Sequence, residues 1–255
     1  SRKKGSTTAL EPSYFDKTQD YSSDDPTIAY FLTCQNVGVT TNEMREKIII
    51  TQDIRNGNGR TVKSRFVTPN RVDHLAEPID AVFWIMKDDS LPPVLRIDDP
   101  TLATAFGATL ATKRSSAENV TNGDTNQLII EPFANPFRAY PLGEDYQAFR
   151  TLFESGRTKC YVLNTGNYNG KKVTPAITLG SIEKIVRETG KFIPFGISYL
   201  SIEGMEVPFD DRAYRQLLQE RLRIRTQYIR SLNAYHSLPK EAAESIENLI
   251  GQLAK

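Results

Sequence analysis

The sequence predicts an α/β fold in which a mixed β-sheet is flanked by helices and followed by a helical carboxyl-terminal tail. Two observations predict it. From residue 81 to residue 190, short apolar runs typical of strands alternate with segments whose apolar residues recur at helical spacing. After residue 211, the spacing of the apolar residues is helical throughout. A chain of 255 residues is long enough to bury a sizeable core around such a sheet.

Five apolar runs are expected to form strands. The most strand-like is 81–86, which reads Ala-Val-Phe-Trp-Ile-Met. Because this run is apolar throughout rather than alternating, we predict a central strand that is covered on both faces. The other expected strands are 47–51, 61–66, 94–97 and 159–163. The first two of these flank an Asn-Gly-Asn-Gly turn at 56–59, which indicates a hairpin-like pair.

The expected helices are recognised by their first residues and by their apolar stripes. Asp99 and Pro100 indicate a helix start, because an Asp side chain can cap free amides and Pro fits the first helical position. Leu102, Phe106 and Leu110 supply the apolar stripe of this helix. The other expected helices span 145–154, 178–188, 211–233 and 240–253.

We expect three segments along the chain. Residues 1–26 are polar and rich in Ser and Thr, and they are expected to be disordered or to act as a linker. This beginning, without an initiator Met, is typical either of an interior piece of a longer protein or of a disordered terminus. Residues 27–210 are expected to form the α/β domain, and 211–255 to form helices that pack on it.

Composition argues against several functional classes. Lys and Arg number 32 against 31 for Asp and Glu, and this balance argues against a nucleic-acid or membrane-surface partner, although a local basic pocket is compatible with it. Cys34 and Cys160 are too few and too far apart for a disulfide framework or a zinc site, and Cys160 is expected to be a buried, unreactive thiol. No apolar stretch reaches the roughly 20 residues of a membrane span, and no signal peptide opens the chain. These features predict a cytoplasmic protein.

Standard catalytic signatures are absent from the sequence. It contains no G-x-x-x-x-G-K-[ST] phosphate loop, no G-x-G-x-x-G, no H-E-x-x-H and no G-x-S-x-G. The two histidines are His74 and His236, and neither is matched by a serine in a sharp strand-to-helix turn. A hydrolase is therefore not expected.

Arg96 is the first residue that the pattern singles out. It lies within an apolar strand, after the rigid sequence Leu-Pro-Pro-Val at 91–94. An unpaired guanidinium would be costly in such a place, so Arg96 is expected to meet an anion. That anion is either a structural carboxylate or the phosphate of a ligand, and the residues alone favour the carboxylate.

A second feature is the loop at 164–172, Asn-Thr-Gly-Asn-Tyr-Asn-Gly-Lys-Lys, which follows a buried strand and leads toward a helix. Ligands of α/β proteins bind outside the carboxyl ends of strands, so this loop lies where a binding site is expected. Its glycines allow close approach of the backbone, and its lysines can face a nucleotide. Taken alone, such a sequence is more often a solvated loop.

Together these features resemble the carboxyl-terminal half of ATP-type phosphoenolpyruvate carboxykinases, over residues 72–190. In that family a hydrophobic strand leads into a Leu-Pro-Pro-Val segment and then an arginine, as 83–86, 91–94 and Arg96 do here. A Glu-Pro loop with aromatic residues follows in the family and is similar to 131–137. The resemblance implies the fold of that family's carboxyl-terminal domain, and it implies that Arg96 contacts the transferred phosphate and the substrate.

The later part of the resemblance concerns the nucleotide. In the family, a strand that ends in Asn-Thr-Gly is followed by Gly-Lys-Arg and then by a threonine that begins a helix. In this chain, residues 161–166 are similar to the strand, 170–172 to the Gly-Lys-Arg segment, and Thr178 to the threonine. Lys172 replaces the family arginine and cannot stack or form a planar fork in the same way. The resemblance thus implies ATP as the cofactor, with Arg96 as the catalytic residue and a nucleotide site formed by Asn164, Thr165, Gly166, Lys171, Lys172 and Thr178.

The departures from the family concern catalysis. The family's phosphate loop, its paired aspartates and its metal-holding Lys and His have no counterpart in this chain, so the ligands for Mg²⁺ or Mn²⁺ are expected from the rest of a full-length protein. The resemblance implies a protein that transfers phosphate between ATP and a small carboxylate and decarboxylates it, of which this chain is a carboxyl-terminal piece that is inactive alone. The alternative is a non-catalytic nucleotide-binding or protein-interaction domain that retains only the scaffold.

Overall fold

The chain divides into two compact units. The first consists of Ser1–Pro78 and Arg114–Gln127, and the second of Ile79–Lys113 and Leu128–Lys255. The computed structural model describes the following residues: 15–16, 18, 21–22, 24–26, 28–34, 37–51, 61–62, 77–113, 128–135, 138–195, 199–202 and 210–253. The expectation of a disordered or linker segment at 1–26 falls largely outside these residues, as do the turn at 56–59 and His74.

Short elements make up the described part of the first unit. They are the strands β1 (Phe15–Asp16), β2 (Val39–Thr41), β3 (Lys47–Ile49) and β4 (Thr61–Val62) and the 3-10 helix η2 (Ile28–Thr33). Within η2, Phe31 is fully buried and stacks on Tyr30, with ring centroids 4.2 Å apart.

The strand pairing in this unit differs from the predicted hairpin. β3 pairs with β2 and β4 pairs with β1, both antiparallel, so 47–51 does not pair with 61–66 over the described residues. The reason is a tighter local turn before β3. The Asn42 side chain accepts a hydrogen bond from the Glu46 backbone amide and donates one to the Glu46 carboxylate, each at 2.9 Å, and this closes the β2–β3 turn.

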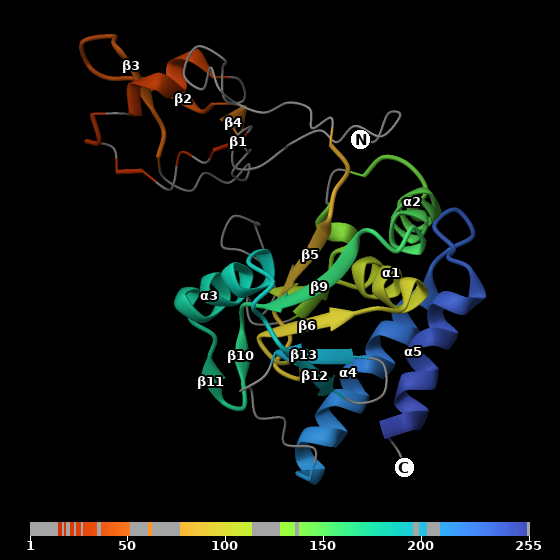
Figure 1. Ribbon diagram of the computed structural model, residues 1–255. Coiled ribbons are helices and arrows are strands. Elements are labelled where there is room, and N and C mark those ends of the chain that lie inside the picture. The colour runs from red at the N-terminus through yellow and green to blue at the C-terminus, as the bar shows by residue number, and fades with distance from the viewer. Residues whose placement is uncertain are drawn as a thin grey trace. The chain divides into compact units, whose positions relative to one another are not determined.

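The second unit is built on a five-stranded mixed sheet with the order β12-β13-β6-β9-β5 (Figure 1). Its strands are β5 (Ala81–Met86), β6 (Val94–Ile97), β9 (Lys159–Asn164), β12 (Phe192–Phe195) and β13 (Tyr199–Ile202). β5 and β9 are parallel, and the other neighbours are antiparallel. The predicted α/β fold with a mixed sheet is confirmed.

β5 lies at the edge of this sheet among the described strands, since β9 is the one that pairs with it. Ile85 on β5 is 60% exposed. The prediction that 81–86 is a central strand covered on both faces is therefore wrong. The continuous apolar run has a different cause: Trp84 packs into the main core on one face, while Phe83 stacks on Tyr161 on the other.

Helices cover the two faces of the sheet unequally. The helices of the second unit are α1 (Pro100–Ala108), α2 (Leu142–Glu154), α3 (Pro175–Val186), α4 (Arg212–Ser231) and α5 (Lys240–Leu253). Residues of α1, α2, α4 and α5 form one large buried cluster with one face of the sheet. On the other face, α3 packs over Val94 and Leu163 through Ile182 and Ile185. None of the helices that the structure describes has both the length and the apolar character needed to cross a membrane.

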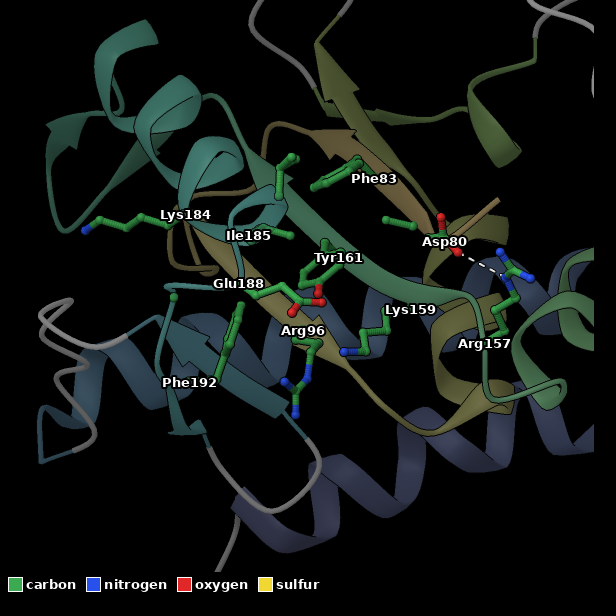
Figure 2. Close-up of a pocket in the computed structure, with 13 residues that line it drawn as sticks. Asp80, Phe83, Arg96, Arg157, Lys159, Tyr161, Lys184, Ile185, Glu188 and Phe192 are labelled. Carbon is green, nitrogen blue, oxygen red and sulfur yellow. Dashed lines mark hydrogen bonds and ion pairs between the residues drawn. The ribbon is translucent and has the colours of Figure 1, made fainter. Parts of the chain in front are cut away.

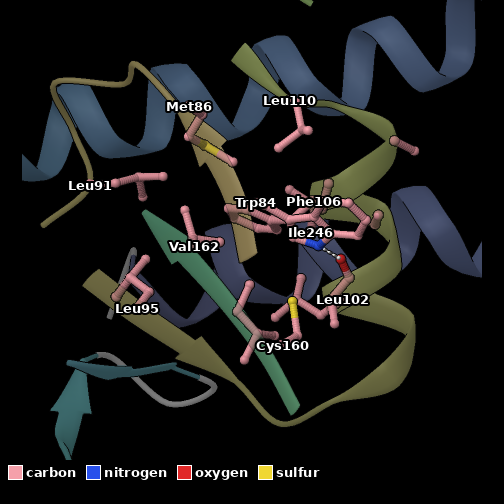
Figure 3. Close-up of a cluster of buried hydrophobic side chains, with 14 of the residues drawn as sticks. Trp84, Met86, Leu91, Leu95, Leu102, Phe106, Leu110, Cys160, Val162 and Ile246 are labelled. Atoms are coloured by element: carbon pink, nitrogen blue, oxygen red, sulfur yellow. Dashed lines mark hydrogen bonds between the residues drawn. The ribbon is translucent and has the colours of Figure 1, made fainter. Parts of the chain in front are cut away.

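The large cluster is closely packed around Trp84 (Figure 3). The Trp84 indole donates a hydrogen bond to the Ala103 carbonyl of α1 at 3.1 Å. Cys160 is 1% exposed in this cluster, and burial raises the pKa of its thiol, as expected for an unreactive cysteine. The core therefore lies on the side of the sheet away from α3.

A buried ion pair ties α4 to the end of β5. Arg225 donates to Asp88 at 2.7 Å, and the two side chains are 2% and 1% exposed. Arg225 also donates to the Thr109 carbonyl, just after α1, and its guanidinium lies 4.8 Å from the centre of the Phe106 ring. This network positions the loop that leads from β5 to β6.

Four short strands and one 3-10 helix complete the second unit. These are β7 (Ala111–Lys113), which pairs with β8 (Leu128–Ile130), η3 (Pro132–Ala134), and β10 (Asn167–Tyr168), which pairs with β11 (Lys171–Lys172). The Glu-Pro loop that resembles the carboxykinase family is described only in part, since 136–137 lie outside the described residues.

Candidate functional site

An open hollow of about 720 Å³ lies on the face of the sheet that α3 covers only partly (Figure 2). Strand residues form its floor, and the last turn of α3 together with the segment after it forms one wall. The side chains that matter most for its chemistry are Phe83, Arg96, Lys159, Tyr161, Glu188 and Phe192.

The floor of the hollow is aromatic because of the strand register. Phe83 and Arg96 both pair with Tyr161 across neighbouring strands, so the three side chains share a face. The Phe83 and Tyr161 rings are stacked with centroids 5.2 Å apart, and Phe192 lies 5.9 Å from Tyr161. Burial raises the pKa of Tyr161, although the Arg96 charge opposes this in part, so the phenol is neutral at physiological pH.

The hollow contains more cationic than anionic groups. Arg96 binds Asp98 through two hydrogen bonds of 2.9 and 3.0 Å, and its guanidinium lies 4.9 Å from the centre of the Phe192 ring. The prediction that Arg96 meets a structural carboxylate is thereby confirmed. At one end of the hollow, Arg157 pairs with Asp80 at 3.0 Å.

Lysines and one glutamate complete the charge distribution. Lys159 and Lys184 also line the hollow, and no carboxylate of the described residues lies within 4.0 Å of either amine. Figure 2 shows the Lys184 amine pointing outward at the rim and the Glu188 carboxylate lying beside the Tyr161 hydroxyl. Lys159 and Arg96 are consequently the cations best able to contact a ligand on the aromatic floor.

Asn164 has a structural role at the end of β9. It is fully buried, donates to the carbonyls of Leu91 (2.7 Å) and Asn167 (2.9 Å), and accepts from the amide of Gly166 (2.9 Å). Its oxygen also accepts from the Asp88 amide at 3.3 Å. Asn164 thus holds the Leu-Pro-Pro loop against the turn after β9, and its hydrogen-bonding groups are occupied without a ligand.

Thr165 and Gly166 complete this turn. Thr165 bonds to the Met86 carbonyl through its amide (2.9 Å) and its hydroxyl (3.3 Å). A Cβ atom on Gly166 would lie 3.3 Å from both the Asn164 oxygen and the Lys87 Cβ, so a larger residue would be tightly packed there. The Asn-Thr-Gly sequence is explained by the close approach of the β5 and β9 ends.

The other predicted nucleotide residues lie near the beginning of α3. Lys171 and Lys172 are exposed on β11, and Thr178 is half-buried in the first turns of α3. α3 begins at Pro175, three residues before the predicted start, because Thr174 accepts a hydrogen bond from the Ile177 amide and Pro175 takes the first helical position.

The structure brings together only part of the predicted set. Arg96 and α3 are on the same face of the sheet, but Arg96 alone of the predicted site residues lines the hollow. Residue reasoning missed Phe83, Lys159, Tyr161 and Phe192. One signal could have found two of them: Lys159 and Tyr161 alternate with the buried Cys160, which puts a cation and an aromatic ring on the face opposite the core.

No metal site is formed by the described part of the chain, where no group of three or more His, Cys, Asp or Glu side chains is arranged to hold an ion. Comparison of the sequence with protein-family models gives no match, and no curated protein is significantly similar to it. The chemistry of the hollow is therefore the basis for a functional proposal.

Proposed function

We propose that this chain is the carboxyl-terminal part of a phosphoenolpyruvate carboxykinase-like protein and that it binds the phosphates of a nucleotide. In the whole protein it would contribute these contacts to ATP-dependent phosphoryl transfer and decarboxylation of a small carboxylate, and alone it would not catalyse that reaction. The observation that carries the proposal is Arg96 in an open, cationic hollow with an aromatic floor. The resemblance of residues 72–190 to the carboxykinases, of which Arg96 is a part, also supports it.

The hollow is chemically suited to a phosphate. A guanidinium binds phosphate oxygens through two parallel hydrogen bonds, and the Arg96 guanidinium is placed in the hollow, over the Phe192 ring. Lys159 adds a second positive charge on the same face of the sheet. Two cations on neighbouring strands can contact adjacent phosphates of one polyphosphate chain.

The hollow is bordered by the last turn of α3, so the nucleoside part of the ligand would have to extend along this helix, over about 18 Å, to reach its beginning. The helix N-terminus carries partial positive charge, and Lys171, Lys172 and Thr178 supply exposed or half-buried polar groups around it. Since lysine cannot stack on a base as arginine does, we expect weak selection among nucleotide bases.

The described residues do not fit a Mg²⁺ or Mn²⁺ site, because they contain no group of three or more His, Cys, Asp or Glu side chains placed to hold an ion. The proposed whole-protein chemistry would need these ligands from another segment. No catalytic step is assigned to this chain, and its part is to bind and orient the phosphates.

Calorimetric titration of the chain with ATP tests this proposal. Arg96→Ala is expected to weaken ATP binding roughly ten- to a hundredfold, the effect of losing hydrogen bonds to a charged group. Arg230→Ala is the control, because Arg230 is also an arginine in an ion pair, with Glu247 on α5, and does not line the hollow. Equal affinity of the Arg96→Ala variant and the wild type would refute the proposed site.

A second candidate is a scaffold that has lost the chemistry and serves as a protein-interaction domain. One observation favours it. Asn164, the first residue of the carboxykinase-like turn, makes its hydrogen bonds to other residues of the fold and has none left for a ligand. If ATP does not bind at all in the titration above, this second candidate is the better interpretation.

A further inference from the structure

Asp98 binds the Arg96 guanidinium in the manner in which a phosphate would bind it. Two carboxylate oxygens accept from Nε and Nη2 at 2.9 and 3.0 Å. Residues two apart in an extended strand point to the same side, which is why Asp98, directly after β6, reaches Arg96. A ligand phosphate and the Asp98 carboxylate would therefore need the same donors.

The Arg96–Asp98 ion pair differs in its surroundings from the Asp88–Arg225 pair, which joins α4 to the end of β5. The Arg96 and Asp98 side chains are 25% and 58% exposed, whereas both members of the Asp88–Arg225 pair are almost fully buried. Asp88 is also held by the amide and hydroxyl of Ser90, whereas no bond of Asp98 to a described residue other than Arg96 is seen. Exposed pairs contribute little to stability and exchange readily with solvent or ligands.

Arg96 has a second contact that does not depend on Asp98. Its guanidinium lies over the Phe192 ring, 4.9 Å from the ring centre. This contact would keep the guanidinium within the hollow after the carboxylate had rotated into solvent. Arg96 thus has a contact in the hollow that the loss of the Asp98 carboxylate would not remove.

We infer that Asp98 sets the anion affinity of the hollow by competing for Arg96, so that a ligand phosphate must displace the Asp98 carboxylate. The inference rests on the proposed function in one respect, that an anion binds at Arg96. It adds a residue outside the carboxykinase-like set and a consequence for ligand choice.

The consequence for ligand choice follows from the charge balance. Asp98 and Glu188 both oppose an incoming anion, so a ligand with few charges that contacts Arg96 alone gains little by replacing Asp98. A polyphosphate that also contacts Lys159 gains a second attraction. The hollow should therefore prefer tripolyphosphate to inorganic phosphate, and removal of the Asp98 charge should reduce that preference.

Titration with inorganic tripolyphosphate tests the inference on five proteins: wild type, Asp98→Asn, Asp98→Ala, Arg96→Ala and the double variant with Asp98→Asn and Arg96→Ala. Asp98→Asn is expected to bind roughly fivefold more tightly than the wild type, the size of an exposed ion pair. In the Arg96→Ala background the same change is expected to have no effect, because the contested donors are gone. Asp98→Ala should behave as Asp98→Asn does, since either change removes the carboxylate charge.

Asp80→Asn is the matched control, because Asp80 is the other aspartate paired with an arginine in the hollow. If Asp80→Asn tightens binding as much as Asp98→Asn does, the effect is general electrostatics and the inference is overturned. Weaker binding by Asp98→Asn would also overturn it, since Asp98 would then position Arg96. If the wild type binds tripolyphosphate and Asp98→Asn binds it no more tightly, the inference is overturned but the proposed function is not. If none of the proteins binds it, the proposed function is overturned as well.

Discussion

At the scale of single residues, this chain uses Asp–Arg pairs for two different purposes. Asp88 and Arg225 are buried, and a large network of hydrogen bonds around them joins α4 to the sheet. Arg96 and Asp98 form a pair beside an open hollow, and the Asp98 side chain is mostly exposed. Burial decides the difference, because a buried charge cannot leave its partner without a large cost while an exposed one can.

Tyr146 is a second residue with a testable role. Its side chain is fully buried between helices, and its hydroxyl makes no hydrogen bond to the described residues. A buried hydroxyl without a partner is unfavourable, so Tyr146→Phe is expected to raise the free energy of unfolding by about 1 kcal/mol at neutral pH. Urea unfolding followed by circular dichroism would measure it. A clear loss of stability would show that the hydroxyl has a partner.

The same residue gives the stability a pH dependence. Burial raises the pKa of Tyr146 from 10.0 to about 12, so the folded state holds the phenol proton more tightly than the unfolded state does. Below pH 10 the phenol is neutral in both states. As the pH rises from 10 toward 12, the unfolded state loses its phenol proton first, so the free energy of unfolding falls. The Tyr146→Phe variant should lose less stability over that interval than the wild type.

At the scale of elements, two glycines on helices should respond to alanine in opposite ways. A Cβ atom on Gly107 of α1 would lie 2.7 Å from the rings of both Phe133 and Trp84, whereas one on Gly180 of α3 would meet nothing within 4 Å. Gly107→Ala is expected to cost about 1–3 kcal/mol through overpacking, and Gly180→Ala to stabilise the fold by up to about 1 kcal/mol. Thermal unfolding of the two variants measures this contrast, and similar melting temperatures would contradict it.

The boundaries of elements could be predicted where the signal is local. The Asp99 carboxylate accepts from the Leu102 amide at 2.6 Å and begins α1, as its capping chemistry indicates. α5 spans Lys240–Leu253, the predicted range, because its apolar stripe is regular. α3 was misjudged by three residues, since Thr174 and Pro175 were not recognised as a cap and a first helical residue.

At the scale of the whole molecule, the order of strands could not be predicted from the runs themselves. An apolar strand at an edge and one in the centre look alike when a stacked aromatic pair covers the second face, as Phe83 and Tyr161 do on β5 and β9. The hollow could not be predicted either, because it depends on which strands are neighbours. Its floor comes from strands far apart in the sequence, and only their pairing gathers Arg96, Lys159 and Tyr161 on one face.

The sheet is unequally covered, and this arrangement explains why the hollow exists. Four helices bury one face, while α3 covers the other only over Val94 and Leu163. The remaining part of that face borders the hollow, whose lining includes Phe83 and the buried Tyr161. The molecule thus combines a rigid, well-packed layer with an accessible cationic surface, which is the arrangement that a binding site needs.

The most direct test of the account is nuclear magnetic resonance of the chain during titration with ATP. The account predicts that the Arg96 side-chain Nε–Hε signal shifts together with the backbone amides of β6, of β9 from Lys159 to Tyr161 and of the first turn of α3. Signals of α4 and α5, which lie on the covered face of the sheet, should stay in place. Shifts that spare Arg96 and are confined to those two helices, or no shifts at saturating ATP, would contradict it.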